Sequence, residues 1–159
     1  MEPKIIDLSS KILVGMHVSM SLADNKTGDL WRAFMPRRRE VVNRVDENFI
    51  SMQVYQKGEQ NHFLPTTVFD KWAVVEVSDA DEIPEGMETY VMQGGKYAMF
   101  VHHGSANEFP KTMQSIFGEW MPRSDYQLDD REQFEVLAEN YDPIDVNARE
   151  EVWIPIREK

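Results

Sequence analysis

Two pairs of short segments recur in the same order along this chain. The segment Lys11–His17 is echoed by Lys96–His102, an offset of 85 residues (96 minus 11). The segment Leu30–Arg37 is echoed by Ile116–Arg123, an offset of 86 residues (116 minus 30). Two copies are too few for a solenoid, which needs at least ~3 repeats to bury a continuous core. The repetition therefore predicts two related halves packed against each other, with a crevice where they meet, and small ligands bind in such crevices.

Length and composition limit the class of protein. A chain of 159 residues with 42% hydrophobic residues is expected to fold as one domain over 1–159, with pseudo-repeats at about 5–80 and 85–159. No apolar run approaches the ~18 residues of a membrane span. The formal charge of −11 argues against direct nucleic-acid binding, and the lack of cysteine indicates a reducing, cytoplasmic location without thiolate metal sites.

Hydrophobic patterning predicts an α+β fold in which each half supplies strands and one long helix. Expected helices span Asp29–Val45, with a kink at Pro36, and Asn107–Trp120, with Asn107 as the N-cap. Gly94-Gly95 is expected to form a hairpin turn, and Pro155 to place its strand at a sheet edge or at a bulge. The expected strands are Ile12–Leu22, Phe49–Gln56, Lys71–Ser78, Met87–Met92, Lys96–His103, Phe134–Glu139 and Glu151–Arg157.

Glu135 is the leading candidate for a functional side chain. It lies in a short strand-like run, where alternation puts it on one face with Leu137 and Glu139. Burying an unpaired carboxylate costs several kcal/mol, so Glu135 is either exposed to solvent or held for a cationic partner. The pattern alone leaves both interpretations open.

Six aromatic side chains are candidates for the wall of a pocket that stacks on a flat or cationic ligand; the alternative is that they fill the core. They are Trp31, Tyr55, Tyr97, Phe100, Trp120 and Trp153. Neither a metal site nor a cofactor is expected, because the adjacent pair His102-His103 would point to opposite faces of a strand. The chain also lacks a phosphate-binding loop and a nucleophile elbow.

At the level of whole motifs, the chain resembles the GyrI-like, or AraC-type, effector-binding domain family. The resemblance covers nearly the whole chain and is carried by Gly95–Gly104, Trp120–Tyr126, Phe134–Val136, Asn140–Pro143 and Glu151–Ile156. It implies duplicated β-α-β-β modules with pseudo-two-fold symmetry, an antiparallel sheet, two long helices and a central ligand pocket. It also implies that Glu135 is the buried pocket glutamate of that family, while Leu137 replaces the aromatic residue usually found two positions later.

Three functions follow from this resemblance. The first is a stand-alone protein that senses or sequesters a small, aromatic or cationic, drug-like molecule through Glu135 and aromatic walls. The second is a small hydrolase for cyclopropanoid-type electrophiles, in which Glu135 acts as general base and Tyr97 as proton donor. The third is an interaction protein whose partner is a regulator or DNA gyrase.

Overall fold

The computed structural model of the chain describes residues 1–159 and shows an α+β architecture built on a nine-stranded antiparallel sheet. The strands are β1 (Lys4–Leu8), β2 (Lys11–Met20), β3 (Phe49–Tyr55), β4 (Phe69–Val77), β5 (Glu88–Met92), β6 (Gly95–His103), β7 (Tyr126–Leu128), β8 (Gln133–Leu137) and β9 (Arg149–Glu158). Helix α1 (Thr27–Phe34) continues into a 3-10 turn, Met35–Glu40. The second helix begins with a 3-10 turn at Ala106–Glu108 and runs through α2 (Phe109–Gln114), a π-helical segment (Ser115–Trp120) and α3 (Met121–Arg123).

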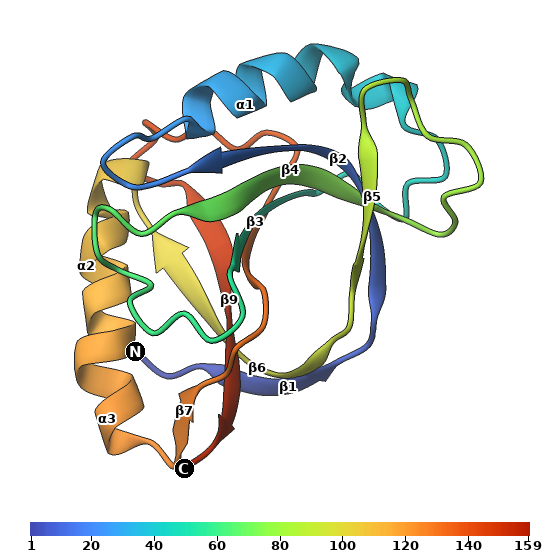
Figure 1. Cartoon of the computed structure of the whole chain (residues 1–159). Coiled ribbons are helices and arrows are strands. Elements are labelled where there is room, and N and C mark those ends of the chain that lie inside the picture. The colour runs from blue at the N-terminus through green and yellow to red at the C-terminus, as the bar shows by residue number, and fades with distance from the viewer.

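The strands are ordered β1-β6-β9-β8-β3-β4-β2-β5, and β7 pairs with β9. Figure 1 shows the sheet strongly curled, with α1 over β2 and β4 and the second helix along the β6–β9 side. Both helices lie on the outer face of the sheet, and the central strands β3 and β8 separate them. None of the helices combines the length and apolarity that a membrane span requires.

The first strand of each half pairs with the other half: β1 pairs with β6, and β5 pairs with β2. After β1, the chain passes Ser9-Ser10 and continues as β2 at the other side of the sheet, where β2 pairs with β4 and β5. The segment from β5 to β6 runs between the same two sides of the sheet in the opposite direction. The predicted Gly94-Gly95 hairpin is therefore wrong, because β5 and β6 do not pair with each other. Both glycines have positive φ, and a Cβ on Gly94 would lie 2.3 Å from the Leu8 carbonyl oxygen, so the two crossing segments require glycine there.

The centre of the sheet lies between Ser51 of β3 and Glu135 of β8. These two residues face each other in the β3–β8 register, and they are separated by 84 positions (135 minus 51). An offset of this size matches the spacing of the recurring sequence segments. Ser51 and Glu135 thus hold corresponding places in the two halves and meet at the pseudo-two-fold axis.

Three apolar clusters hold the fold together. One lies beneath α1 and centres on Leu30, Phe34 and Val75, and a second lies beneath the other helix around Ile116 and Ile154. The third fills the inner side of the curled sheet with Leu13, Ile50, Met52, Trp72, Val74, Met92, Tyr97 and Phe134. Most strands are consequently buried on both faces, which explains their nearly continuous apolar sequences.

The second predicted helix and the longer strands are confirmed, but three local predictions are wrong. The first helical region ends at Glu40 and not at Val45, because the backbone is already extended at Val41. Asn107 caps no helix with its side chain, because it lies inside the 3-10 turn that precedes α2. Pro155 is not in an edge strand: β9 pairs with β6 on one side and with β8 and then β7 on the other. On one side of β9, Pro155 lies between the residues that pair with β8 and those that pair with β7. No sheet hydrogen bond is therefore lost through the missing N–H of Pro155. Strands β1 and β7 were not predicted from the sequence.

Candidate functional site

A cavity of about 1130 Å³ lies over the central strands, between the two helices. Its floor is formed by side chains of β3, β4, β8 and β9, and its walls come from the helices and the loop between β3 and β4. The wall residues are predominantly apolar; they include Met20, Leu22, Trp31, Met35, Phe49, Phe63, Phe69, Phe109, Met113 and Phe117. The volume slightly exceeds the ~300–1,000 Å³ range of small-molecule pockets, and the concave apolar lining is typical of such sites.

Glu135 lies on the cavity floor, where it is buried and hydrogen-bonded. The amide nitrogen of Gln53 donates to Glu135 Oε2 at 3.0 Å, and Lys71 Nζ lies 3.9 Å from Glu135 Oε1. Lys71 also donates to the amide oxygen of Gln53, which fixes the orientation of that amide. The three side chains form one connected polar group in an apolar environment.

Burial shifts the pKa values of both charged members of this group. Desolvation raises the pKa of Glu135, although the Lys71 ammonium and the Gln53 hydrogen bond oppose the rise. Desolvation likewise lowers the pKa of Lys71, against the attraction of Glu135 and Glu150. The two shifts bring the carboxylate and the ammonium closer in proton affinity, so Glu135 and Lys71 titrate as a coupled pair.

A second carboxylate, Glu150 of β9, also lines the cavity and is only 8% exposed. No Lys, Arg or His nitrogen lies within 4.0 Å of it. Desolvation raises the pKa of Glu150, and the neighbouring Tyr141 hydroxyl opposes that rise. The pKa of Tyr141, another cavity residue, is raised by burial and by the Glu150 charge.

Four of the sequence-predicted residues line the cavity: Glu135, Trp31, Tyr55 and Leu137. The Trp31 ring meets Phe49 edge-on, with centroids 6.1 Å apart. The Tyr55 ring stacks on His62 at 4.1 Å, its hydroxyl donates to the His62 carbonyl oxygen, and burial raises the pKa of Tyr55 to about 12. Their contact with a ligand stays a prediction.

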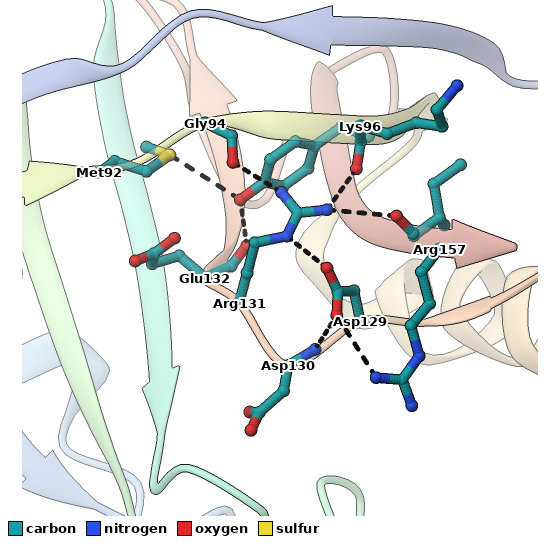
Figure 2. A network of polar contacts seen from close by, with 10 residues as sticks. Met92, Gly94, Lys96, Asp129, Asp130, Arg131, Glu132 and Arg157 are labelled. Carbon is teal, nitrogen blue, oxygen red and sulfur yellow. Dashed lines mark hydrogen bonds and ion pairs between the residues drawn. The ribbon is translucent and has the colours of Figure 1, made fainter.

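Tyr97 and Trp153 lie on the opposite, inner face of the sheet, so their predicted place in the cavity is corrected. The Tyr97 hydroxyl donates to the Glu132 carbonyl oxygen at 2.8 Å, and its ring lies under the Arg131 guanidinium at 4.8 Å. Figure 2 shows that guanidinium bonded to Asp129 and to backbone oxygens of Gly94 and Lys96. Trp153 stacks on Phe134, and neither ring reaches Glu135, because Phe134 and Glu135 point to opposite faces of β8.

Phe100 and Trp120 occupy the outer face but lie beneath the second helix, not in the cavity. Phe100 shares the face of Glu135, since each is opposite Val152 of β9. Trp120 covers it edge-on at 5.2 Å, within the apolar cluster under that helix. The space at this point is filled by core side chains, so the prediction that these two aromatics line the pocket is corrected too.

The sequence reasoning missed Lys71, Glu150, Gln53 and Gln133 on the floor and the aromatic walls Phe63, Phe69, Phe109 and Phe117. The sequence did contain a signal for the two charged residues, Lys71 and Glu150. Lys71 lies in an alternating buried series with Phe69, Ala73, Val75 and Val77, and Glu150 begins one with Val152, Ile154 and Ile156. A charged residue in a buried apolar series is a candidate for a partnered or functional group.

A curled sheet with two covering helices and an apolar, acid-floored cavity between them defines a small-molecule binding domain. Residues 1–157 match the family described as the GyrI-like small molecule binding domain, and the chain belongs to this family. The transcriptional regulator BrlR of Pseudomonas aeruginosa is 26% identical over 158 residues, covering 98% of this chain and 56% of BrlR. The chain thus spans about half the length of that curated relative.

Solved structures agree in fold. An integron cassette protein of Vibrio cholerae has a TM-score of 0.70 at 15% identity, with 98% of this chain and 96% of that chain covered. SAV2435, solved bound to tetraphenylphosphonium, has a TM-score of 0.69 at 14% identity, with 99% of this chain and 94% of that chain covered. These likenesses confirm the expected α+β fold.

Proposed function

We propose that this domain binds a bulky, apolar organic cation in the central cavity. The observation that carries the proposal is the presence of two buried carboxylates, Glu135 and Glu150, on the floor of a large cavity with mostly apolar walls. Apolar walls supply binding energy through buried area, about 25 cal/mol per Å². An acidic floor supplies selectivity for positive charge, since a cation there compensates carboxylates that are costly to bury.

The charge on the floor supports a cation over an anion or a neutral molecule. Two buried carboxylates, Glu135 and Glu150, face one ammonium, Lys71, so ionisation of all three leaves one negative charge without a partner. The Trp31 and Tyr55 rings on the walls add cation–π attraction, which is worth about 0.5–2 kcal/mol for a desolvated cation.

Relatives offer a parallel for this ligand class. SAV2435 was solved with tetraphenylphosphonium, a large aromatic cation, and BrlR is a transcriptional regulator. We therefore propose that ligand binding serves to sense or sequester such cations. A sensing role would act through a regulatory partner, and a sequestering role needs none.

The test compares a cation with a neutral molecule of similar size. Calorimetric titration with tetraphenylphosphonium and with triphenylphosphine oxide should show tighter binding of the cation by the wild type. Glu135→Gln should weaken cation binding by about 1–3 kcal/mol, the scale of a charge-assisted contact, and leave the neutral ligand unaffected. Equal losses for both ligands, or none for the cation, would refute the proposal.

The hydrolase alternative has weaker support. The raised pKa of Glu135 suits a general base, but Tyr97, its expected proton-donating partner, has its hydroxyl bound on the other face of the sheet. A binding role uses every group on the floor without requiring that partner. No observation in the structure specifically favours the gyrase-modulator alternative.

A further inference from the structure

We propose that Glu150, and not Glu135, is the counter-ion that a bound cation meets, and that Lys71 holds Glu135 as an internal ion pair. The inference rests on the proposed function and specifies it: the preferred ligand carries a single positive charge, and its charged centre lies at the β9 side of the cavity.

Glu135 is already engaged by the protein. Lys71 Nζ lies 3.9 Å from its Oε1 atom, and Gln53 donates to its Oε2 atom at 3.0 Å. The side chains of Lys71 and Glu135 are each about nine-tenths buried. A ligand cation that paired with Glu135 would have to compete with the Lys71 ammonium beside it, and two like charges about 4 Å apart repel each other strongly when both are shielded from water.

Glu150 has no such partner. It is as buried as Glu135 and lines the cavity, yet no cationic nitrogen lies within 4.0 Å of it. His102 is opposite Glu150 in the β6–β9 register, but its two ring nitrogens bond the Thr112 hydroxyl and the Ser105 carbonyl oxygen. The neighbours that lower the pKa of Glu150 are the uncharged Tyr141 hydroxyl and, from beyond 4.0 Å, His102 and Lys71. A carboxylate buried without a cation beside an open cavity is a binding group for one.

The pseudo-symmetry explains why the floor is asymmetric. Ser51 and Glu135 hold corresponding positions at the pseudo-two-fold axis. On the side away from the axis, Ser51 is opposite Ala73 of β4, and Glu135 is opposite Val152 of β9. Two residues before those partners, on the same faces, lie Lys71 and Glu150. Equivalent positions of the two halves therefore carry opposite charges. One end of the cavity floor is neutralised from within, and the other is left negative.

The net charge of the Lys71–Glu135 pair does not depend on which of the two residues holds the proton. Lys71 and Glu135 sum to zero whether they are an ammonium and a carboxylate or an amine and a carboxylic acid. Among the buried groups of the floor, only Glu150 then carries a charge without a partner, which matches a monocation; Glu139 also lines the cavity, but it is exposed to solvent.

Four variants test the assignment, with tetraphenylphosphonium as cation and triphenylphosphine oxide as neutral probe. Glu150→Gln should weaken binding of the cation at least about tenfold. Glu135→Gln should also weaken it, because Lys71 is left as an unpaired positive charge. Lys71→Met/Glu135→Gln removes the whole internal pair and should return cation affinity to within about threefold of wild type. Glu151→Gln is the matched control: it makes the same charge change one residue along β9, on the face away from the cavity, and should have no effect.

The neutral probe reports whether the cavity of each variant is intact, since its affinity should stay within about twofold throughout. The assignment would be overturned if Lys71→Met/Glu135→Gln bound the cation as weakly as Glu135→Gln does, while Glu150→Gln bound it normally. That result would identify Glu135 as the contact, and the proposed function would stand. A wild type that binds neither probe, or binds both equally, would overturn the proposed function and this inference together.

Discussion

The rings of Phe63 and Phe117 meet at the cavity rim, with centroids 4.5 Å apart. Phe63 belongs to the loop between β3 and β4, and Phe117 to the π-helical segment of the second helix. Both residues line the cavity, so their contact joins the loop of one half to the helix of the other across the opening. A wide π turn is a common way to place a side chain at a functional site.

Phe63→Ala should make ligand exchange faster. An aromatic pair of this kind is worth about 0.5–1.5 kcal/mol, so its loss should raise the association and dissociation rates by roughly two- to tenfold. Stopped-flow fluorescence with a cationic dye measures both rates. Leu64→Ala is the control, because Leu64 is the exposed neighbour in the same loop and does not line the cavity. Unchanged rates in Phe63→Ala would show that this contact does not limit entry.

Cation affinity should fall as the pH is lowered. Burial raises the pKa of Glu135 and of Glu150 above the ordinary 4.5, so protonation removes the negative charge of the floor at a pH above that value. The other titratable groups that act on Glu150 are Lys71, His102 and Tyr141. Binding of a cation favours the ionised carboxylate and thus releases protons.

Titrations between pH 5 and pH 8 should show tetraphenylphosphonium binding that strengthens with pH, while triphenylphosphine oxide binding stays constant. In Glu150→Gln most of this dependence should disappear. A cation affinity that rises on acidification would contradict the assigned charges.

The sequence predicted the outer architecture of this protein better than its site. Alternation and turn residues located both helices and seven strands, since these signals are local. The pairing of β1 with β6 and of β5 with β2 depends on contacts between segments far apart in the chain. Nothing near Gly94-Gly95 distinguishes a hairpin from a crossing strand.

The misplacement of Tyr97 and Trp153 has a similar cause. Strand alternation separates the two faces of a strand, but both faces of β6 and β9 are buried here. An apolar or aromatic residue therefore fits either the packed inner face or the cavity face. The strand pattern left Glu135 open between an exposed and a functional position, and the resemblance to the effector-binding family singled it out. Lys71 and Glu150 lie in similar buried series, but no motif of that resemblance pointed to them.

Arg131 should be a major determinant of stability, although it does not line the cavity. Its guanidinium donates to the carbonyl oxygens of Gly94, Lys96 and Ile156 and pairs with Asp129 (Figure 2). Arg131→Met keeps the length of the side chain but leaves these partly buried acceptors without a donor, which should cost about 2–4 kcal/mol. Urea unfolding followed by circular dichroism measures the loss.

Arg32→Met is the matched control for Arg131→Met. Arg32 also pairs with an aspartate, Asp29, but both side chains are about three-quarters exposed. An exposed pair contributes less than about 1 kcal/mol, so this variant should unfold close to the wild type. Similar losses in the two variants would mean that the backbone contacts of Arg131 add nothing.

The buried Lys71–Glu135 pair should reduce the stability of the fold while it sets the charge of the cavity. Desolvation lowers the pKa of Lys71 and raises that of Glu135, which shows that burial opposes both charges more strongly than their contact favours them. Replacing such a pair with apolar residues is often neutral or stabilising by about 1–4 kcal/mol. Lys71→Met/Glu135→Leu should therefore unfold at an equal or higher urea concentration than the wild type. Lys71→Met alone should be destabilised, because it leaves the Glu135 carboxylate buried without its ammonium. A double variant less stable than the wild type would show that the pair is a net structural gain.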